Sequence, residues 1–182
     1  MDMDATIKGR RSIRKYQLKE VPDSVIEELL NLATYAPSSM NGQPWHFVVV
    51  RNERTKKQLV EIKNRHCPVE KKMYRADFLQ NAPVVIIICV DQHKSYGRDV
   101  ENAVLAAANI MLGAHSMGVG SVYMSAYKSG EPRVAEDIRQ ALDIPEHVAP
   151  ITIIPLGYPD ETPEPKEIRS LAEMVAYEAI HS

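Results

Sequence analysis

The sequence has little cysteine and almost no net charge. Its 182 residues include two cysteines, Cys67 and Cys89, and no C-x-x-C spacing joins them. This pattern argues against a disulfide framework or a cysteine zinc site and indicates a reducing compartment, so we expect a cytoplasmic protein. A formal charge of −2 argues against a general basic field for nucleic acid, although a local basic site remains open.

Long hydrophobic runs are also missing. The longest strongly apolar run, Val84–Val90, is far too short to cross a bilayer as a helix. The N-terminus carries acids where a secretory signal would carry positive charge. We therefore expect a soluble protein without a membrane partner. The length suits one domain, predicted over residues 1–182.

Apolar periodicity predicts a mixture of helices and strands. Helices are expected over Ile7 to about Arg11, Asp23–Ser24 to before Pro37, Thr55–Asn64, Asp99–Met117, Pro132–Leu142 and Leu171–Ile180. Strands are expected over His46–Val50, Val84–Val90, Gly120–Met124 and Val148–Leu156. The residues expected to cap helix N-termini are Asp4, Ser24 with Glu27, and Ser170 with Glu173. Gly118 is expected to end the central helix. Without a regular βαβ alternation, the fold class is α+β.

Two segments could carry chemistry. The first, Arg10-Arg11-Ser12-Ile13-Arg14, places three guanidinium groups and a hydroxyl at a helix end. Arginine's planar fork suits bidentate contact with a phosphate. Taken alone, however, the segment fits a solvated basic helix end better.

The second segment is Ala36-Pro37-Ser38-Ser39-Met40-Asn41-Gly42-Gln43-Pro44-Trp45-His46-Phe47. Its serines and asparagine could be turn formers, and its tryptophan could be a core anchor. A polar loop set against an aromatic residue and an apolar strand also suits a planar heterocycle. Composition leaves both interpretations open. The six histidines show no metal spacing, so no metal site is expected.

Together, the order and spacing of these two segments resemble the nitroreductase family of FMN enzymes. Ala114–Ser121 is similar to the family's central helix and its exit, Ile154–Pro159 to its last core strand, and Lys166–Glu178 to its C-terminal tail. The resemblance covers essentially the whole chain. It implies a nitroreductase-like fold, with a central, mostly antiparallel sheet flanked by helices, in an intertwined homodimer.

The resemblance also implies an FMN site at the dimer interface. Arg10, Arg11 and Ser12 would hold the phosphate and ribityl chain, and Arg14 would lie near the N1/O2 edge of the flavin. The flavin bound mainly by the other subunit would be reached by a loop containing Pro37, Ser38, Ser39, Asn41 and Gln43. Backbone contacts around the reactive ring edge would come from Tyr123, Met124 and Ser125. From the tail, Lys166 and Arg169 would return to the phosphate, although Ile168 stands where the family often has a second arginine.

The implied activity is hydride transfer from NAD(P)H through flavin N5 to a nitroaromatic, quinone or related electron-poor acceptor. Because the cofactor carries the chemistry, no catalytic acid or base is expected from the protein. A same-fold deiodinase or flavin-fragmenting enzyme is the main alternative and would use about residues 65–79 as a lid. A non-catalytic flavin sensor and a helical interaction module are further alternatives.

Overall fold

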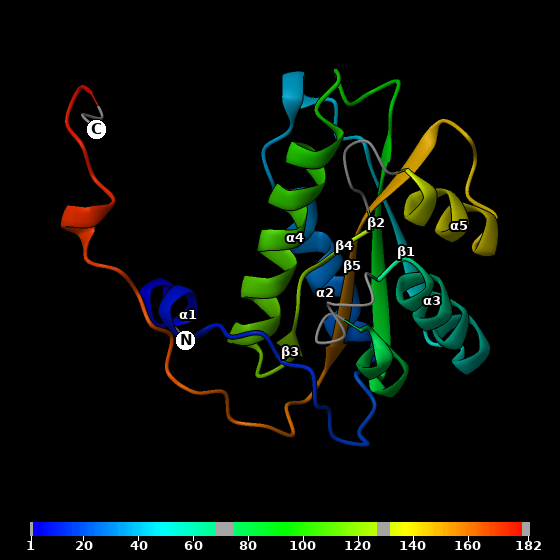
Figure 1. Cartoon of the computed structure of the whole chain (residues 1–182), viewed down its shortest axis with the longest axis horizontal. Helices are drawn as coiled ribbons and strands as arrows, with labels where there is room; N and C mark the ends of the chain where they lie inside the picture. The colour runs from blue at the N-terminus through cyan, green and yellow to red at the C-terminus, as the bar shows by residue number, and fades with distance from the viewer. Residues whose placement is uncertain (1, 68–74, 127–131, 180–182) are drawn as a thin grey trace.

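An antiparallel sheet forms the centre of the protein (Figure 1). The computed structural model describes residues 2–67, 75–126 and 132–179. Within them the strands are β1 (Trp45–Val50), β2 (Val84–Asp91), β3 (Gly120–Ser121), β4 (Met124–Ser125) and β5 (Val148–Gly157). Their order is β1-β2-β5-β3, β4 also pairs with β5, and every pairing is antiparallel. The predicted α+β class is confirmed.

Helices cover both faces of the sheet. They are α1 (Met3–Gly9), α2 (Asp23–Thr34), α3 (Glu53–Arg65), α4 (Asp99–Ser116) and α5 (Arg133–Ala141), with the short 3-10 helices η1 (Ser39–Asn41), η3 (Asp77–Asn81) and η4 (Leu171–Glu173). Figure 1 shows α2 and α4 on one side of the sheet and α3 and α5 on the other. Among the described residues, no helix has the length and apolarity needed to cross a membrane.

Successive side chains of β2 point to opposite faces of the sheet, and this divides the core into two clusters. Ile86 and Ile88 face α2 and α4, whereas Ile87 and Cys89 face α3 and α5. All of them are fully buried, as the continuous β-branched run predicts. Burial raises the pKa of the Cys89 thiol to about 12, so this cysteine is the core residue that the sequence predicts.

Several boundaries differ from the sequence prediction. The strand expected over Gly120–Met124 is split into β3 and β4, because Val122 and Tyr123 leave the ladder with β5. Asp2, rather than Asp4, caps α1, and its carboxylate accepts the backbone N–H of Ala5 at 2.8 Å. Asn52 caps α3 in the same way, and no side chain caps α2. These differences stay near element ends, where local signals compete.

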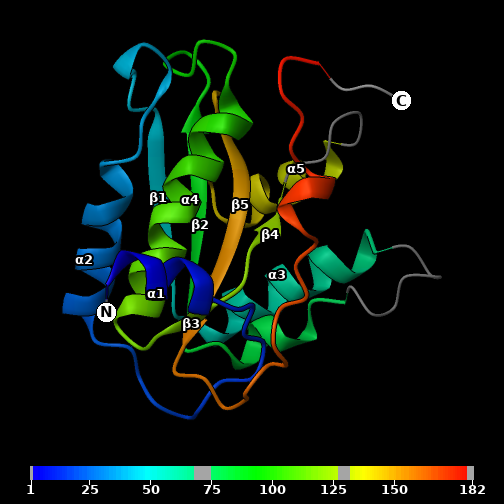
Figure 2. The same cartoon turned by 90° about the vertical axis from the view of Figure 1, so that its left-hand side faces the viewer.

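The predicted closing helix is wrong over the residues that the structure describes; Ile180 lies outside them. Only η4 is helical, although the Ser170 hydroxyl does donate to the Glu173 carboxylate at 2.9 Å. Residues 164–179 are all exposed, and the tail lies outside the body of the molecule (Figures 1 and 2). So short a helix is marginal in water without a surface to pack on, and this chain alone offers none.

Candidate functional site

The segment after α1 runs extended beside two other parts of the chain. The backbone N–H of Ile13 donates to the carbonyl of Ser121 at 3.0 Å, and that of Gln17 to the carbonyl of Tyr158 at 2.9 Å. The strand-like segment of residues 10–17 therefore lies between β3 and the residues that directly follow β5. This arrangement places its arginines at the edge of the sheet.

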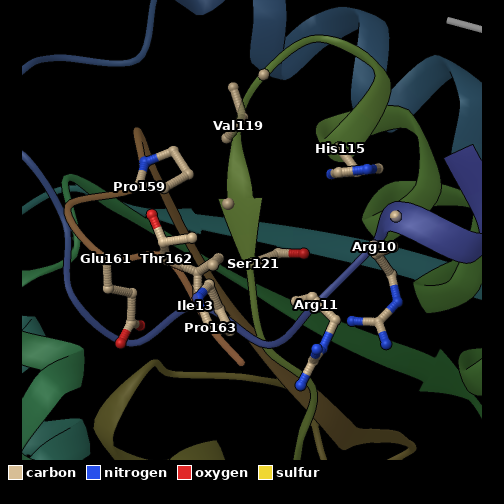
Figure 3. A pocket seen from close by; sticks show the side chains of 13 residues that line it. Arg10, Arg11, Ile13, His115, Val119, Ser121, Pro159, Glu161, Thr162 and Pro163 are labelled. Carbon is tan, nitrogen blue, oxygen red and sulfur yellow. The ribbon is translucent and has the colours of Figure 1, made fainter. Parts of the chain in front are cut away.

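Arg10 and Arg11 line a cavity of about 290 Å³ (Figure 3). The other lining residues are Gly9, Ile13, His115, Gly118, Val119, Gly120, Ser121, Pro159, Glu161, Thr162 and Pro163. Among the described residues, no carboxylate lies within ion-pair distance of either guanidinium group. Arg11 donates to the backbone carbonyl of Glu164, which brings the tail to the arginines. The cavity thus carries two cations that an anion could bind.

Glu161 lies across this cavity from the two arginines (Figure 3). Its carboxylate accepts the backbone N–H groups of Arg14 and Lys15. Those bonds fix the backbone on either side of the Arg14 α-carbon. Glu161 was not among the predicted site residues, because no spacing in the sequence links it to a segment near the N-terminus.

Two glycines shape the wall of the cavity. Gly118 ends α4 with a φ of +74°, which confirms the predicted C-terminal glycine. At Gly120, a β-carbon would lie 2.8 Å from the β-carbon of Ile13. The close approach of the arginine segment to β3 therefore requires glycine at position 120.

Arg14 lines a second cavity, of about 240 Å³, together with Tyr123, Met124 and Ser125. Its other lining residues are Lys63, Arg75, Phe78 and Val122. The guanidinium carbon of Arg14 lies 5.9 Å from the centroid of the Phe78 ring. Burial is the largest cause of the raised pKa of Tyr123. Four of the predicted site residues thus meet around one cationic, partly aromatic cavity.

Lys63 is a member of this cavity that the sequence analysis missed. Its Nζ donates to the backbone carbonyl of Ser125 at 2.7 Å. Burial lowers the pKa of this ammonium group. A signal was available, because Leu59, one turn earlier on α3, is fully buried, so Lys63 falls at the edge of the apolar face.

The loop of Pro37–Gln43 has an unusual backbone. Met40, Asn41 and Gln43 have φ values of 51°, 54° and 43°, in the left-handed region that non-glycine residues rarely adopt. The Ser38 hydroxyl accepts the Gln43 backbone N–H at 3.1 Å, and the Gln43 side chain donates to the Asn41 side chain at 3.2 Å. Strain of this kind gathers at ligand-binding loops.

Asn102 holds this loop on the first turns of α4. Its side-chain oxygen accepts the backbone N–H of Ser39 at 3.0 Å, and its amide donates to the carbonyl of Ser95 at 3.2 Å. The indole N–H of Trp45 donates to the backbone carbonyl of Asn102 at 2.9 Å. Trp45 is therefore an anchor for the loop. Asn102, also missed, was visible as an amide at the start of an otherwise apolar helix.

Comparison with known proteins assigns the family. The sequence model of the Nitroreductase family matches residues 7–158. The chain belongs to the nitroreductase family. A protein of Methanothermobacter thermautotrophicus, provisionally named an NADH dehydrogenase/NAD(P)H nitroreductase, is 42% identical over 170 residues, which cover 92% of this chain and 83% of that protein.

Two further relatives differ in what their names say. An iodotyrosine deiodinase of Thermotoga neapolitana is 28% identical over 181 residues, which cover 90% of this chain and 91% of that protein. The solved structure of an FMN-dependent nitroreductase of Clostridium difficile has a TM-score of 0.85 and 29% identity, and the match covers 98% of this chain and 100% of that one. The fold expected from the family resemblance is confirmed.

In this nitroreductase-family chain, the predicted site residues do not all meet. The Pro37–Gln43 loop lies at the N-terminal end of α4, whereas His115, near its C-terminal end, lines the Arg10 and Arg11 cavity. Along α4, the rise from Asn102, which holds the loop, to His115 is about 20 Å. Lys166 and Arg169 are exposed on the tail. Of the hypothesised lid, residues 68–74 lie outside the described part of the chain.

Proposed function

We propose that this protein is an FMN-dependent oxidoreductase that takes electrons from NAD(P)H and passes them to a nitroaromatic, quinone or related electron-poor acceptor. One observation carries the proposal: a single cavity holds two arginines, and no carboxylate of the described residues lies within ion-pair distance of either. A third arginine lines a second cavity. The family membership and the named FMN-dependent relative support it. When bound, FMN supplies the chemistry by accepting a hydride at N5 and donating it to the acceptor.

The donors in the first cavity fit a phosphate. Arg10 and Arg11 approach from one side, and Ser12 follows on the extended segment that pairs with Ser121. Guanidinium groups bind phosphate oxygens through paired hydrogen bonds, and a serine hydroxyl adds one donor. Lys166 and Arg169 are assigned to the same phosphate, since the tail already contacts Arg11 through Glu164.

The second cavity fits the edge of a flavin ring. Arg14 provides positive charge, and the short β4 segment with Tyr123 provides backbone groups and a flat wall. The protein orients the ring and excludes water, and no acid or base is required from it. The acceptor would be flat, because it must lie against the same ring face as the nicotinamide.

A homodimer would complete the site. Val104 and Leu105 on α4 are 38% and 40% exposed, and Ile168 and Tyr177 on the tail are 71% and 89% exposed. Apolar side chains exposed in such number favour a partner surface. A second copy of the chain would bring its Pro37–Gln43 loop, with Pro37, Ser38, Ser39, Asn41 and Gln43, to the flavin held by the first. We infer one domain over residues 1–182, with the tail as an arm around the partner, in the cytoplasm.

The test is an anaerobic visible spectrum of the purified protein, reconstituted with FMN, before and after addition of NADH and then NADPH. A flavin spectrum that bleaches with either donor is the expected result, and it identifies the donor. Absence of a flavin spectrum after reconstitution would overturn the proposal. A bound flavin that neither donor bleaches would instead favour a flavin sensor.

Reductive deiodination is the second candidate, favoured by the iodotyrosine deiodinase among the relatives. The two activities separate when the reduced protein is mixed with an iodophenol or with a quinone. Reoxidation by the quinone alone is expected of the proposed function, whereas iodide release would favour the second candidate.

A further inference from the structure

The cavity around Arg14 has an uncompensated positive charge. Of its described lining residues, three are cationic and none is acidic. Arg75 is paired outside the cavity lining with Asp77 at 2.9 Å. Among the described residues, neither Arg14 nor Lys63 has a carboxylate within ion-pair distance of its side-chain cation. The net charge that the cavity offers a ligand is therefore positive.

Lys63 holds its position at an energetic cost. Its ammonium group is half-buried beside the Ser125 carbonyl, 2.7 Å away. Burial lowers its pKa, and this effect exceeds the opposite effect of Cys67. A neutral carbonyl satisfies only one of the three ammonium donors. Withdrawing a cation from water is unfavourable, and an anion arriving in the cavity would offset that cost.

We propose that the Lys63 ammonium is a second positive charge, beside Arg14, for the reduced form of FMN, and that it raises the reduction potential of the bound cofactor. The proposal rests on the proposed function, which assigns the ring edge to this cavity. Reduction by hydride adds two electrons and one proton, so the bound ring gains one negative charge. A cation in the cavity therefore stabilises the reduced form more than the neutral oxidised ring.

Lys63 also has a structural contact, and the two roles can be separated. β4 pairs with β5 through only two residues, Met124 and Ser125, so the Lys63 hydrogen bond helps to fix a short strand. Lys63→Gln removes the charge and keeps a donor, Lys63→Met removes both, and Lys63→Arg keeps both. A structural role predicts that the Gln variant matches wild type, whereas a charge role predicts that it matches the Met variant.

The experiment measures the midpoint potential of bound FMN anaerobically, against a reference dye, in wild type and these three variants. Lys57→Gln is the matched control, because Lys57 is exposed on the same helix and loses the same charge. In wild type, the affinity for reduced FMN divided by the affinity for oxidised FMN is one ratio. We expect this ratio to be on the order of tenfold lower in the Gln and Met variants. For a two-electron couple, that change corresponds to a potential about 30 mV more negative.

The Arg variant and the Lys57→Gln control are expected to keep the wild-type potential. A wild-type potential in the Lys63→Gln variant, or an equal shift in Lys57→Gln, would overturn the role of Lys63 and leave the proposed function standing. A wild-type protein that holds no FMN would overturn both. The potential is measured without an acceptor, so the result does not depend on turnover.

Discussion

At the scale of single residues, Arg10 gives the most direct test of the phosphate site. We expect Arg10→Ala to raise the dissociation constant of FMN by about tenfold to a hundredfold, as loss of a charge-assisted hydrogen bond does. The melting temperature should stay near the wild-type value, because the Arg10 side chain is only half-buried. The measurement is an FMN titration followed by flavin fluorescence. Arg54→Ala, at an exposed position on α3, is the control; equal affinities in the two variants would contradict the assignment.

Single residues also mark how far sequence reasoning reached. Arg10 and Arg11 line one cavity, and Arg14 and Tyr123 line another. The family resemblance assigned all four to FMN, and those roles stay predictions. Glu161 and Lys63 were missed for a physical reason. Each acts through a backbone group distant in sequence. Helical period places Lys63 at the edge of an apolar face, but local composition and spacing do not indicate which group either side chain contacts.

At the scale of elements, the contact between the arginine segment and β3 should be sensitive to one methyl group. We expect Gly120→Ala to lower the free energy of unfolding by about 1–3 kcal/mol, because the new β-carbon would overpack against Ile13. In an Ile13→Ala background the same change should cost less, since two of the three crowding atoms are gone. Urea unfolding of wild type, Gly120→Ala, Ile13→Ala and the double variant measures both costs. Equal costs would show that the contact with Ile13 is not what requires glycine at position 120.

Elements were predictable where the chain itself supplies their partners. β2 and α4 are buried among other elements of the same chain, so apolar pattern predicted both correctly. The tail has a helical pattern over Leu171–Ile180, but its residues up to 179 are exposed. An apolar pattern indicates which face of a helix could be buried. It does not indicate whether the same chain supplies a surface for that face to pack against. The split of the strand at Val122 depends on pairing geometry, which sequence period does not encode.

At the scale of the whole molecule, α4 separates the two segments that we assign to one FMN site. The strained loop containing Asn41 is held at one end through Asn102, and the arginine cavity lies at the other. A rigid helix that separates them by about 20 Å cannot bend to join them. In the homodimer that we propose, the two-fold axis would bring each loop beside the other copy's arginines.

That arrangement predicts complementation between two defective chains. Arg10→Ala and Asn41→Ala copies, given different affinity tags and purified as a heterodimer, contain one site with both defects and one intact site. We expect about half of the wild-type NAD(P)H-dependent bleaching rate, since the two sites of a symmetric dimer are equivalent. A heterodimer of Arg10→Ala with the double variant is the control, because neither of its sites is intact. If the first heterodimer were no more active than this control, each site would have to be built from a single chain.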